Sequence, residues 1–175
     1  WGIAIDNTAG KIYWGDSDGS VSKANLDGSN LELSFFSAAG AEWTGISLDV
    51  ENSRMYLYDY WIEDVYSVNM DGTDDQIILS GVYGYSMLVD TVNDKLYFDE
   101  QNSDRLIMTD LDGSNLQEVN PTLASRTYGI DIDYETGKLY YSGRDTGELY
   151  KSDLDGSNLE VLKSGLSSPR GIFLL

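Results

Sequence analysis

The chain has 175 residues, of which 30 are acidic and 11 are basic, so its net charge at pH 7 is −19. This charge excludes ordinary binding to a nucleic-acid backbone, which needs a basic surface, and it disfavours unaided binding to anionic lipid. The chain contains neither cysteine nor histidine, which excludes disulfides, zinc sites of Cys or His ligands, and serine–histidine triads. No apolar stretch approaches the roughly 18 residues of a membrane-spanning helix, so no direct membrane insertion is expected.

Three sequence anchors recur four times along the chain. The first is an apolar run that ends in Asp6, Asp49, Asp90 and Asp133. The second is an aromatic run at Tyr13-Trp14, Tyr56-Leu57-Tyr58, Tyr97-Phe98 and Tyr140-Tyr141. The third is Asp-Gly within Leu-Asp-Gly-Ser-Asn, or Met-Asp-Gly-Thr-Asp in the second repeat, and its glycines are Gly28, Gly72, Gly113 and Gly156. These anchors keep the same order and divide the chain into repeats of approximately 1–43, 44–84, 85–127 and 128–170.

The predicted elements follow the anchors in chain order. The apolar runs predict first strands at 2–6, 45–49, 86–90 and 129–133, and the aromatic runs predict second strands at 11–14, 54–58, 95–98 and 138–141. A third strand enters each Asp-Gly turn, as at 65–70, and a fourth alternates after it, as at 31–33 and 159–161. Period-two alternation, aromatic content and Asp-Gly turns are all signals of strands and hairpins. Residues 171–175 repeat the pattern of a first strand and are expected to open a further blade.

Four antiparallel strands in about 40 to 45 residues, repeated, are typical of a β-propeller blade. The predicted fold class is therefore all-β, with 1–175 a single β-propeller segment. A β-solenoid is the alternative architecture, but its repeats are usually shorter and do not need two hairpin turns each.

The motifs resemble the YWTD repeat, also called the LDL-receptor class B repeat. Repeat 1–43 carries Ile12-Tyr13-Trp14-Gly15-Asp16, one residue away from Tyr-Trp-Thr-Asp, and the segment 166–172 is similar to the family's link into its next blade. The resemblance implies a non-enzymatic extracellular or cell-surface propeller, usually six-bladed, that binds proteins through one face. Four repeats and one extra strand then predict part of a six-bladed propeller in a longer chain or assembly, and a closed four-bladed ring is the alternative.

One end of each blade is nearly constant in sequence and is expected to be scaffold. It holds the turn from strand one to strand two and the Asp-Gly turn from strand three to strand four. Glycine supplies a positive φ there, and aspartate accepts hydrogen bonds from its own turn. The structural repeat residues are Asp6, Asp49, Asp90, Asp133, Gly28, Gly72, Gly113 and Gly156. Each of these aspartates is also expected to pair with the basic residue five positions later, as Asp6 with Lys11.

The opposite end varies between repeats and carries the candidate partner-binding residues. Aromatic side chains on loops of a rigid scaffold are a usual binding device, although in a propeller they also fill gaps between blades. The candidates are Tyr60, Trp61, Trp43, Tyr83, Tyr85, Phe36 and Tyr128. Tyr60 and Trp61 are favoured because this bulky pair lies mid-loop between acidic residues. The expected partner is a protein or a glycan.

Catalysis and metal binding are the rival predictions. Propellers of similar outline include metal-dependent hydrolases and lactonases, but Asp131 is the one acidic residue among the mid-positions of the expected first strands. Asp16 and Asp18 resemble part of a calcium loop without its distal glutamate, which predicts weak Ca²⁺ binding at most. No other cofactor is expected. A purely architectural repeat within a larger assembly is the third alternative.

Overall fold

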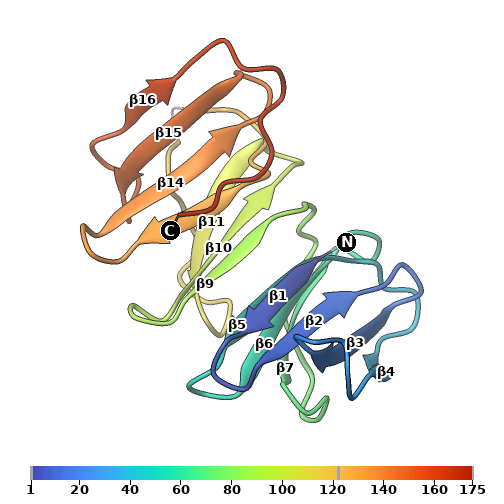
Figure 1. Ribbon diagram of the computed structural model, residues 1–175. Helices are drawn as coiled ribbons and strands as arrows, with labels where there is room; N and C mark the ends of the chain where they lie inside the picture. The colour runs from blue at the N-terminus through green and yellow to red at the C-terminus, as the bar shows by residue number, and fades with distance from the viewer. Residues whose placement is uncertain (1, 122, 175) are drawn as a thin grey trace. The chain divides into compact units, whose positions relative to one another are not determined.

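The computed structural model describes residues 2–121 and 123–174, and these residues form only strands, turns and irregular segments. They contain no helix, and thus none that could cross a membrane. The strands form four-stranded antiparallel sheets in which sequence neighbours pair in order (Figure 1). Each sheet comes from one sequence repeat, so the predicted all-β class with four-stranded blades is confirmed.

The first two sheets belong to the first half of the chain. The first contains β1 (Ile3–Asp6), β2 (Lys11–Gly15), β3 (Ser20–Asn25) and β4 (Glu32–Ser37). The second contains β5 (Trp43–Asp49), β6 (Arg54–Asp59), β7 (Asp64–Asn69) and β8 (Gln76–Ser80). These strands are the blue to green ribbons of Figure 1.

The other two sheets follow in the same pattern. The third contains β9 (Met87–Asp90), β10 (Lys95–Glu100), β11 (Arg105–Asp110) and β12 (Gln117–Glu118). The fourth contains β13 (Ile130–Asp133), β14 (Lys138–Gly143), β15 (Glu148–Asp153) and β16 (Glu160–Lys163). Residues 171–174, where a further strand is predicted, form no assigned strand, although the Leu174 amide donates to Asp131 Oδ2 at 2.7 Å. Residue 175 of that prediction lies outside the described residues.

The chain divides into two compact units, Trp1–Gly84 and Tyr85–Leu175, and each unit holds two sheets. In each unit a hydrophobic core lies between the two sheets, because both contribute buried side chains to one cluster. The core of the first unit includes Val21, Phe36, Trp43, Ile46, Met55, Leu57, Tyr66 and Val68. The core of the second unit includes Tyr97, Leu106, Met108, Val119, Ile132, Leu139, Tyr141 and Tyr150.

The Asp-Gly turns have the geometry of a type I turn followed by a left-handed glycine, which suits the twist of a hairpin. In the first sheet the Gly28 amide donates to Asn25 O at 2.9 Å, and the Asn25 amide donates to Ser29 O at 2.8 Å. Gly28 has a φ of 82°, which a side chain disfavours. The Asp27 carboxylate accepts from the Ser29 amide at 2.9 Å and so closes the turn.

The aspartates at the ends of the first strands hold their own turns. Asp6 Oδ1 accepts from the amides of Thr8 and Ala9, each at 2.9 Å. Asp49, Asp90 and Asp133 accept from turn amides in the same way. Since burial of a carboxylate is costly unless it is hydrogen-bonded, these bonds explain how Asp6, Asp49 and Asp90 stay buried.

The predicted ion pairs between these aspartates and the basic residue five positions later are wrong. Asp6 and Lys11 are register partners across β1 and β2, but the carboxylate is used by the turn amides. Across the described residues, the basic side chains instead reach the end of the third strand or the turn beyond it. Arg54 pairs with Asp74 at 2.7 Å, Lys95 with Asp110, and Lys138 with Asp153.

Candidate functional site

The variable end of each blade is held by a recurring backbone hydrogen bond. It joins the loop between strands two and three to the link that leaves the fourth strand. In the first unit the Ala38 amide donates to Gly19 O at 3.0 Å and the Val82 amide to Glu63 O at 2.9 Å. In the second unit the Ser125 amide donates to Asp104 O at 3.0 Å and the Leu166 amide to Gly147 O at 2.9 Å. In each blade the loop and the link are therefore joined to each other and do not move independently.

Trp61 projects from a loop whose backbone is fixed by a buried carboxylate. Asp59, at the end of β6, is fully buried, and its Oδ1 accepts from the Trp61 amide at 2.7 Å and the Glu42 amide at 3.0 Å. Asp59 thus joins the loop to the link before β5. The Trp61 side chain is 72% exposed. A large aromatic group on a fixed backbone costs little conformational entropy to use in binding.

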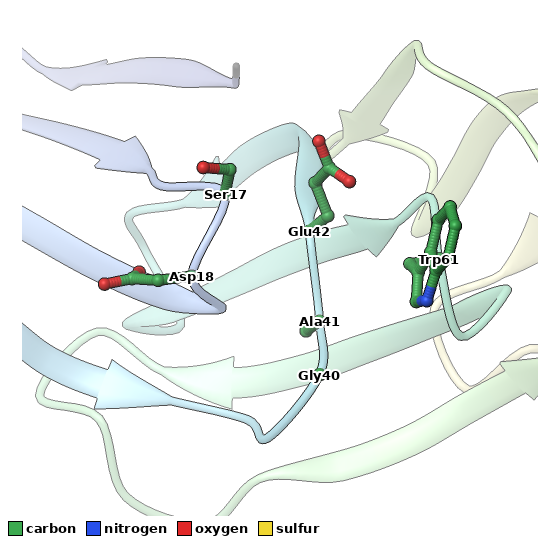
Figure 2. Close-up of a pocket in the computed structure, with 6 residues that line it drawn as sticks. All are labelled: Ser17, Asp18, Gly40, Ala41, Glu42 and Trp61. Carbon is green, nitrogen blue, oxygen red and sulfur yellow. The ribbon is translucent and has the colours of Figure 1, made fainter.

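A pocket of about 360 Å³ lies beside Trp61 in the first unit (Figure 2). It is lined by Ser17, Asp18, Gly40, Ala41, Glu42 and Trp61. Hydrogen bonds from Ser20 lower the pKa of Asp18, so this wall of the pocket is negatively charged at neutral pH. A pocket lined by an indole and by two carboxylates suits a ligand group with an apolar stem and a positive end. The lining holds no pair of groups in acid–base contact.

Tyr60 and Tyr83 form a second aromatic feature in the same unit. Their ring centroids are 4.9 Å apart, and the Tyr83 hydroxyl donates to the Tyr60 hydroxyl at 2.8 Å. Both side chains are half-buried. The pair therefore contributes to the structure of the variable end as well as to its surface.

Two predicted binding residues are core side chains. Trp43 is 0% exposed, and its Nε1 donates to Gly19 O at 2.9 Å. It packs edge-on against Tyr66 with centroids 5.3 Å apart, and Phe36, 7% exposed, packs beside it. The structure therefore corrects the expectation that Trp43 and Phe36 face a partner. Both fill the space between the two blades of the unit, which is the alternative role of such aromatics.

Tyr85 and Tyr128 come together in the second unit. Their rings meet edge to face with centroids 5.2 Å apart, and both side chains are half-buried. The guanidinium groups of Arg144 and Arg170 each lie 5.4 Å from the centroid of Tyr128. Sequence reasoning selected the tyrosines and missed the arginines, although both arginines lie in the same variable segments.

The calcium candidates are held by local hydrogen bonds. Asp18 Oδ1 accepts from the Ser20 amide at 3.0 Å, and Asp16 Oδ2 accepts from the Ser22 hydroxyl at 3.4 Å. Within residues 2–121 and 123–174, no three acidic side chains are grouped to hold a metal ion. Weak Ca²⁺ binding at Asp16 and Asp18 stays a prediction.

Asp131, the candidate for catalysis, lies on β13 beside a pocket of about 380 Å³. Its Oδ2 accepts from the Leu174 amide at 2.7 Å and its Oδ1 from the Ile132 amide at 2.9 Å. Both oxygens therefore have a structural use. Asp133 and Glu135 line the same pocket.

The chain is similar in sequence to a curated receptor and to protein cueball, in each case over only part of the relative's length. It is 30% identical to the vitellogenin receptor of Solenopsis invicta over 105 residues, which are 58% of this chain and 6% of the receptor. It is 29% identical to protein cueball of Drosophila sechellia over 112 residues, again 58% of this chain and 17% of the relative. The chain thus spans a small fraction of the relatives that it matches. No protein-family model matches it.

Solved structures share the fold over nearly the whole chain. A chain in the crystal structure of the nidogen/laminin complex superposes with a TM-score of 0.84 and 22% identity, covering 97% of this chain and 66% of that one. Virginiamycin B lyase from Staphylococcus aureus superposes with a TM-score of 0.75 and 16% identity, covering 99% of this chain and 59% of the lyase. At these identities the likeness establishes the propeller fold alone.

Proposed function

We propose that the chain is a run of YWTD-type β-propeller blades and that it acts as a non-catalytic extracellular module, which binds a protein through the variable ends of its blades. The relatives that support this proposal include a receptor, and the superposed nidogen/laminin structure is a complex between proteins. A glycan is the alternative partner. From the resemblance, we further propose that these blades belong to a six-bladed propeller.

The observation that carries the proposal is the exposure of Trp61 on a loop that its buried neighbour Asp59 holds in place. Exposed large aromatic groups next to a pocket are costly to leave in water and are frequent anchors of interfaces. The acidic wall formed by Asp18 and Glu42 favours a partner segment that presents a basic or amide side chain beside an apolar one.

The test is binding of the purified chain to an array of purified extracellular proteins and to a glycan array. The wild type is compared with Trp61→Ala and with Leu33→Ala, a matched loss of an exposed apolar side chain on β4 away from the pocket. We expect Trp61→Ala to weaken a retained partner at least about tenfold, in the range of an interface anchor. Leu33→Ala should leave that affinity within about twofold, as for surface positions outside the interface.

Thermal unfolding separates binding from packing. Because Trp61 is mostly exposed, its substitution should change stability by less than about 0.5 kcal/mol. Tyr60 is left intact since it shares a hydrogen bond with Tyr83. Equal binding by wild type and Trp61→Ala, or loss of stability without loss of binding, would contradict the proposal. Retention only on the glycan array would favour the alternative partner.

A further inference from the structure

Arginine side chains gather at the variable end of the second unit. That unit contains Arg105, Arg126, Arg144 and Arg170. Arg126 and Arg170 lie in the links that leave the fourth strands, Arg144 lies in the loop after β14, and Arg105 begins β11. In the first unit the three basic residues are Lys11, Lys23 and Arg54, and none lies in a variable loop or link.

At the variable end, the two units share the same backbone hydrogen bonds but carry different side chains. The Tyr60 amide donates to Glu42 O at 3.0 Å, and the Arg144 amide donates to Arg126 O at 2.8 Å in the corresponding place of the second unit. The strand registers agree, because Asp49 pairs with Arg54 as Asp133 pairs with Lys138. Arg126 and Arg144 thus stand where the first unit has an acidic and an aromatic residue.

Two of these arginines share one aromatic ring. The Cζ atoms of Arg144 and Arg170 each lie 5.4 Å from the centroid of Tyr128, which is within the range of cation–π attraction. The two guanidinium groups are therefore no further apart than twice this distance. Tyr85 packs edge to face on Tyr128 and supports the ring.

The carboxylates of the unit neutralise these arginines unequally. Arg126 makes a two-pronged pair with Asp145, with Nε to Oδ2 at 2.8 Å and Nη2 to Oδ1 at 2.6 Å. Arg144 Nη1 reaches the same Asp145 Oδ1 at 3.2 Å. Asp104 lies 4.0 Å from Arg126 and is the other acidic group nearby. One carboxylate therefore serves two arginines.

Donor groups of two arginines beside Tyr128 remain without acceptors. Arg144 Nε is buried and has no hydrogen-bond partner. Arg170 is exposed, and its guanidinium makes no hydrogen bond or ion pair with the residues that the structure describes; its recorded contact is with the Tyr128 ring. An anion that binds within reach of both guanidinium groups is attracted by both positive charges and can accept from the donors that have no partner.

We propose that Tyr128, Arg144 and Arg170 bind carboxylate side chains of an acidic peptide segment in a protein partner. Guanidinium groups match carboxylates with two parallel hydrogen bonds, and the tyrosine ring supplies a flat apolar surface beside them. A long polyanion such as a sulfated glycan is repelled by a chain of net charge −19, whereas a short acidic segment requires only the local arginines. The proposal rests on the proposed function, since it specifies the chemistry of one partner surface.

The test uses fluorescein-labelled hexaglutamate peptide and its hexaglutamine twin, with affinity measured by fluorescence anisotropy at about 50 mM salt, where surface electrostatics is only partly screened. Arg170→Gln is compared with Lys163→Gln, which removes the same charge from an exposed residue of β16. We expect Arg170→Gln to weaken hexaglutamate binding at least about tenfold, as for a hydrogen-bonded charged pair. Lys163→Gln should weaken it less than about twofold, as for a long-range surface charge.

Arg170→Lys distinguishes geometry from charge. It keeps the positive charge but loses the planar fork, so most of the affinity should still be lost. In nitrogen–proton NMR spectra, the Nε–Hε signals of Arg144 and Arg170 should move when hexaglutamate is added. That of Arg54, which is paired with Asp74 and Ser67 at the constant end, should not move.

Three outcomes overturn the proposal: equal effects of Arg170→Gln and Lys163→Gln, equal binding of the two peptides, or tighter binding of a heparin tetrasaccharide through the same arginines. Failure here is distinguishable from failure of the proposed function. The array experiment depends on Trp61 in the other unit and does not involve these arginines.

Discussion

The glycines of the Asp-Gly turns share one backbone conformation but differ in surroundings, and this difference predicts a graded loss of stability. Gly28 and Gly72 have φ values of 82° and 88°. A Cβ at Gly28 meets nothing within 4 Å, whereas a Cβ at Gly72 lies 2.7 Å from the backbone oxygen of Phe35 and 3.2 Å from its ring. Both turns therefore require glycine for its φ, but of these two glycines Gly72 alone is also required for space.

The expected losses in the free energy of unfolding follow from these two requirements, the positive φ and the space for a Cβ. Gly28→Ala places a side chain at positive φ and should cost about 1–2 kcal/mol. Gly72→Ala adds a backbone clash that β4 must yield to, so a further cost of about 1–3 kcal/mol is expected, by analogy with overpacked cores. Gly156→Ala should be the most severe, because its Cβ lies 1.3 Å from the backbone oxygen of Val119.

Urea unfolding followed by tryptophan fluorescence is the assay for the first two variants. The four tryptophans are at positions 1, 14, 43 and 61, all within the first unit, which also contains Gly28 and Gly72. The signal therefore reports the unit that carries both substitutions. Far-UV circular dichroism follows Gly156→Ala. Equal destabilisation by Gly28→Ala and Gly72→Ala would refute the reasoning, since it would mean that φ alone sets the cost.

Three further predictions concern carboxylates. Burial raises the pKa of Asp99 to about 6 against hydrogen bonds that lower it. The folded state therefore holds this proton more tightly than the unfolded state, whose aspartate pKa is about 3.9, and stability should fall by about 2 kcal/mol as pH rises from 4 to 7. Asp99→Asn should remove that part of the slope in denaturation at several pH values, and an unchanged slope would contradict it. Calorimetry should find Ca²⁺ binding no tighter than about 1 mM, weakened further by Asp18→Asn, because few ligands are assembled there; micromolar binding would be inconsistent with this geometry. With divalent metals and a panel of lactones and esters, the chain should show no turnover, and any activity that Asp131→Asn abolishes would favour the hydrolase alternative.

The strands were predictable because their signals are local. Alternation, aromatic runs and Asp-Gly turns each involve residues that are close in sequence. The strands of each blade could therefore be predicted from its own repeat. The role of Asp6 was predictable for the same reason, since the amides that donate to it lie in its own turn. Its proposed pairing with Lys11 failed because adjacency across a hairpin does not decide which carboxylate a long basic side chain reaches.

Side-chain direction at the links was not predictable. The pairing of β5 with β6 shifts register between Trp43 and Gly45, so alternation cannot be extended from the strand into the link. Trp43 consequently turns into the core, while Trp61, which looks equivalent by composition, remains exposed. The Arg144 and Arg170 contacts with Tyr128 were hidden because they join three segments distant in sequence.

The exchange between Asp59 and Asp145 shows what a blade of this kind needs at its variable end. The second sheet uses Asp59 to accept from the Glu42 amide. In the fourth sheet Gly143 stands in the corresponding position, and Asp145, two residues later, accepts from the Arg126 amide at 3.1 Å. The constraint is thus an acceptor for one link amide, and different residues can meet it. Blades can therefore diverge beyond the four-letter signature while keeping their geometry, and the displaced acid frees a loop position for new recognition chemistry.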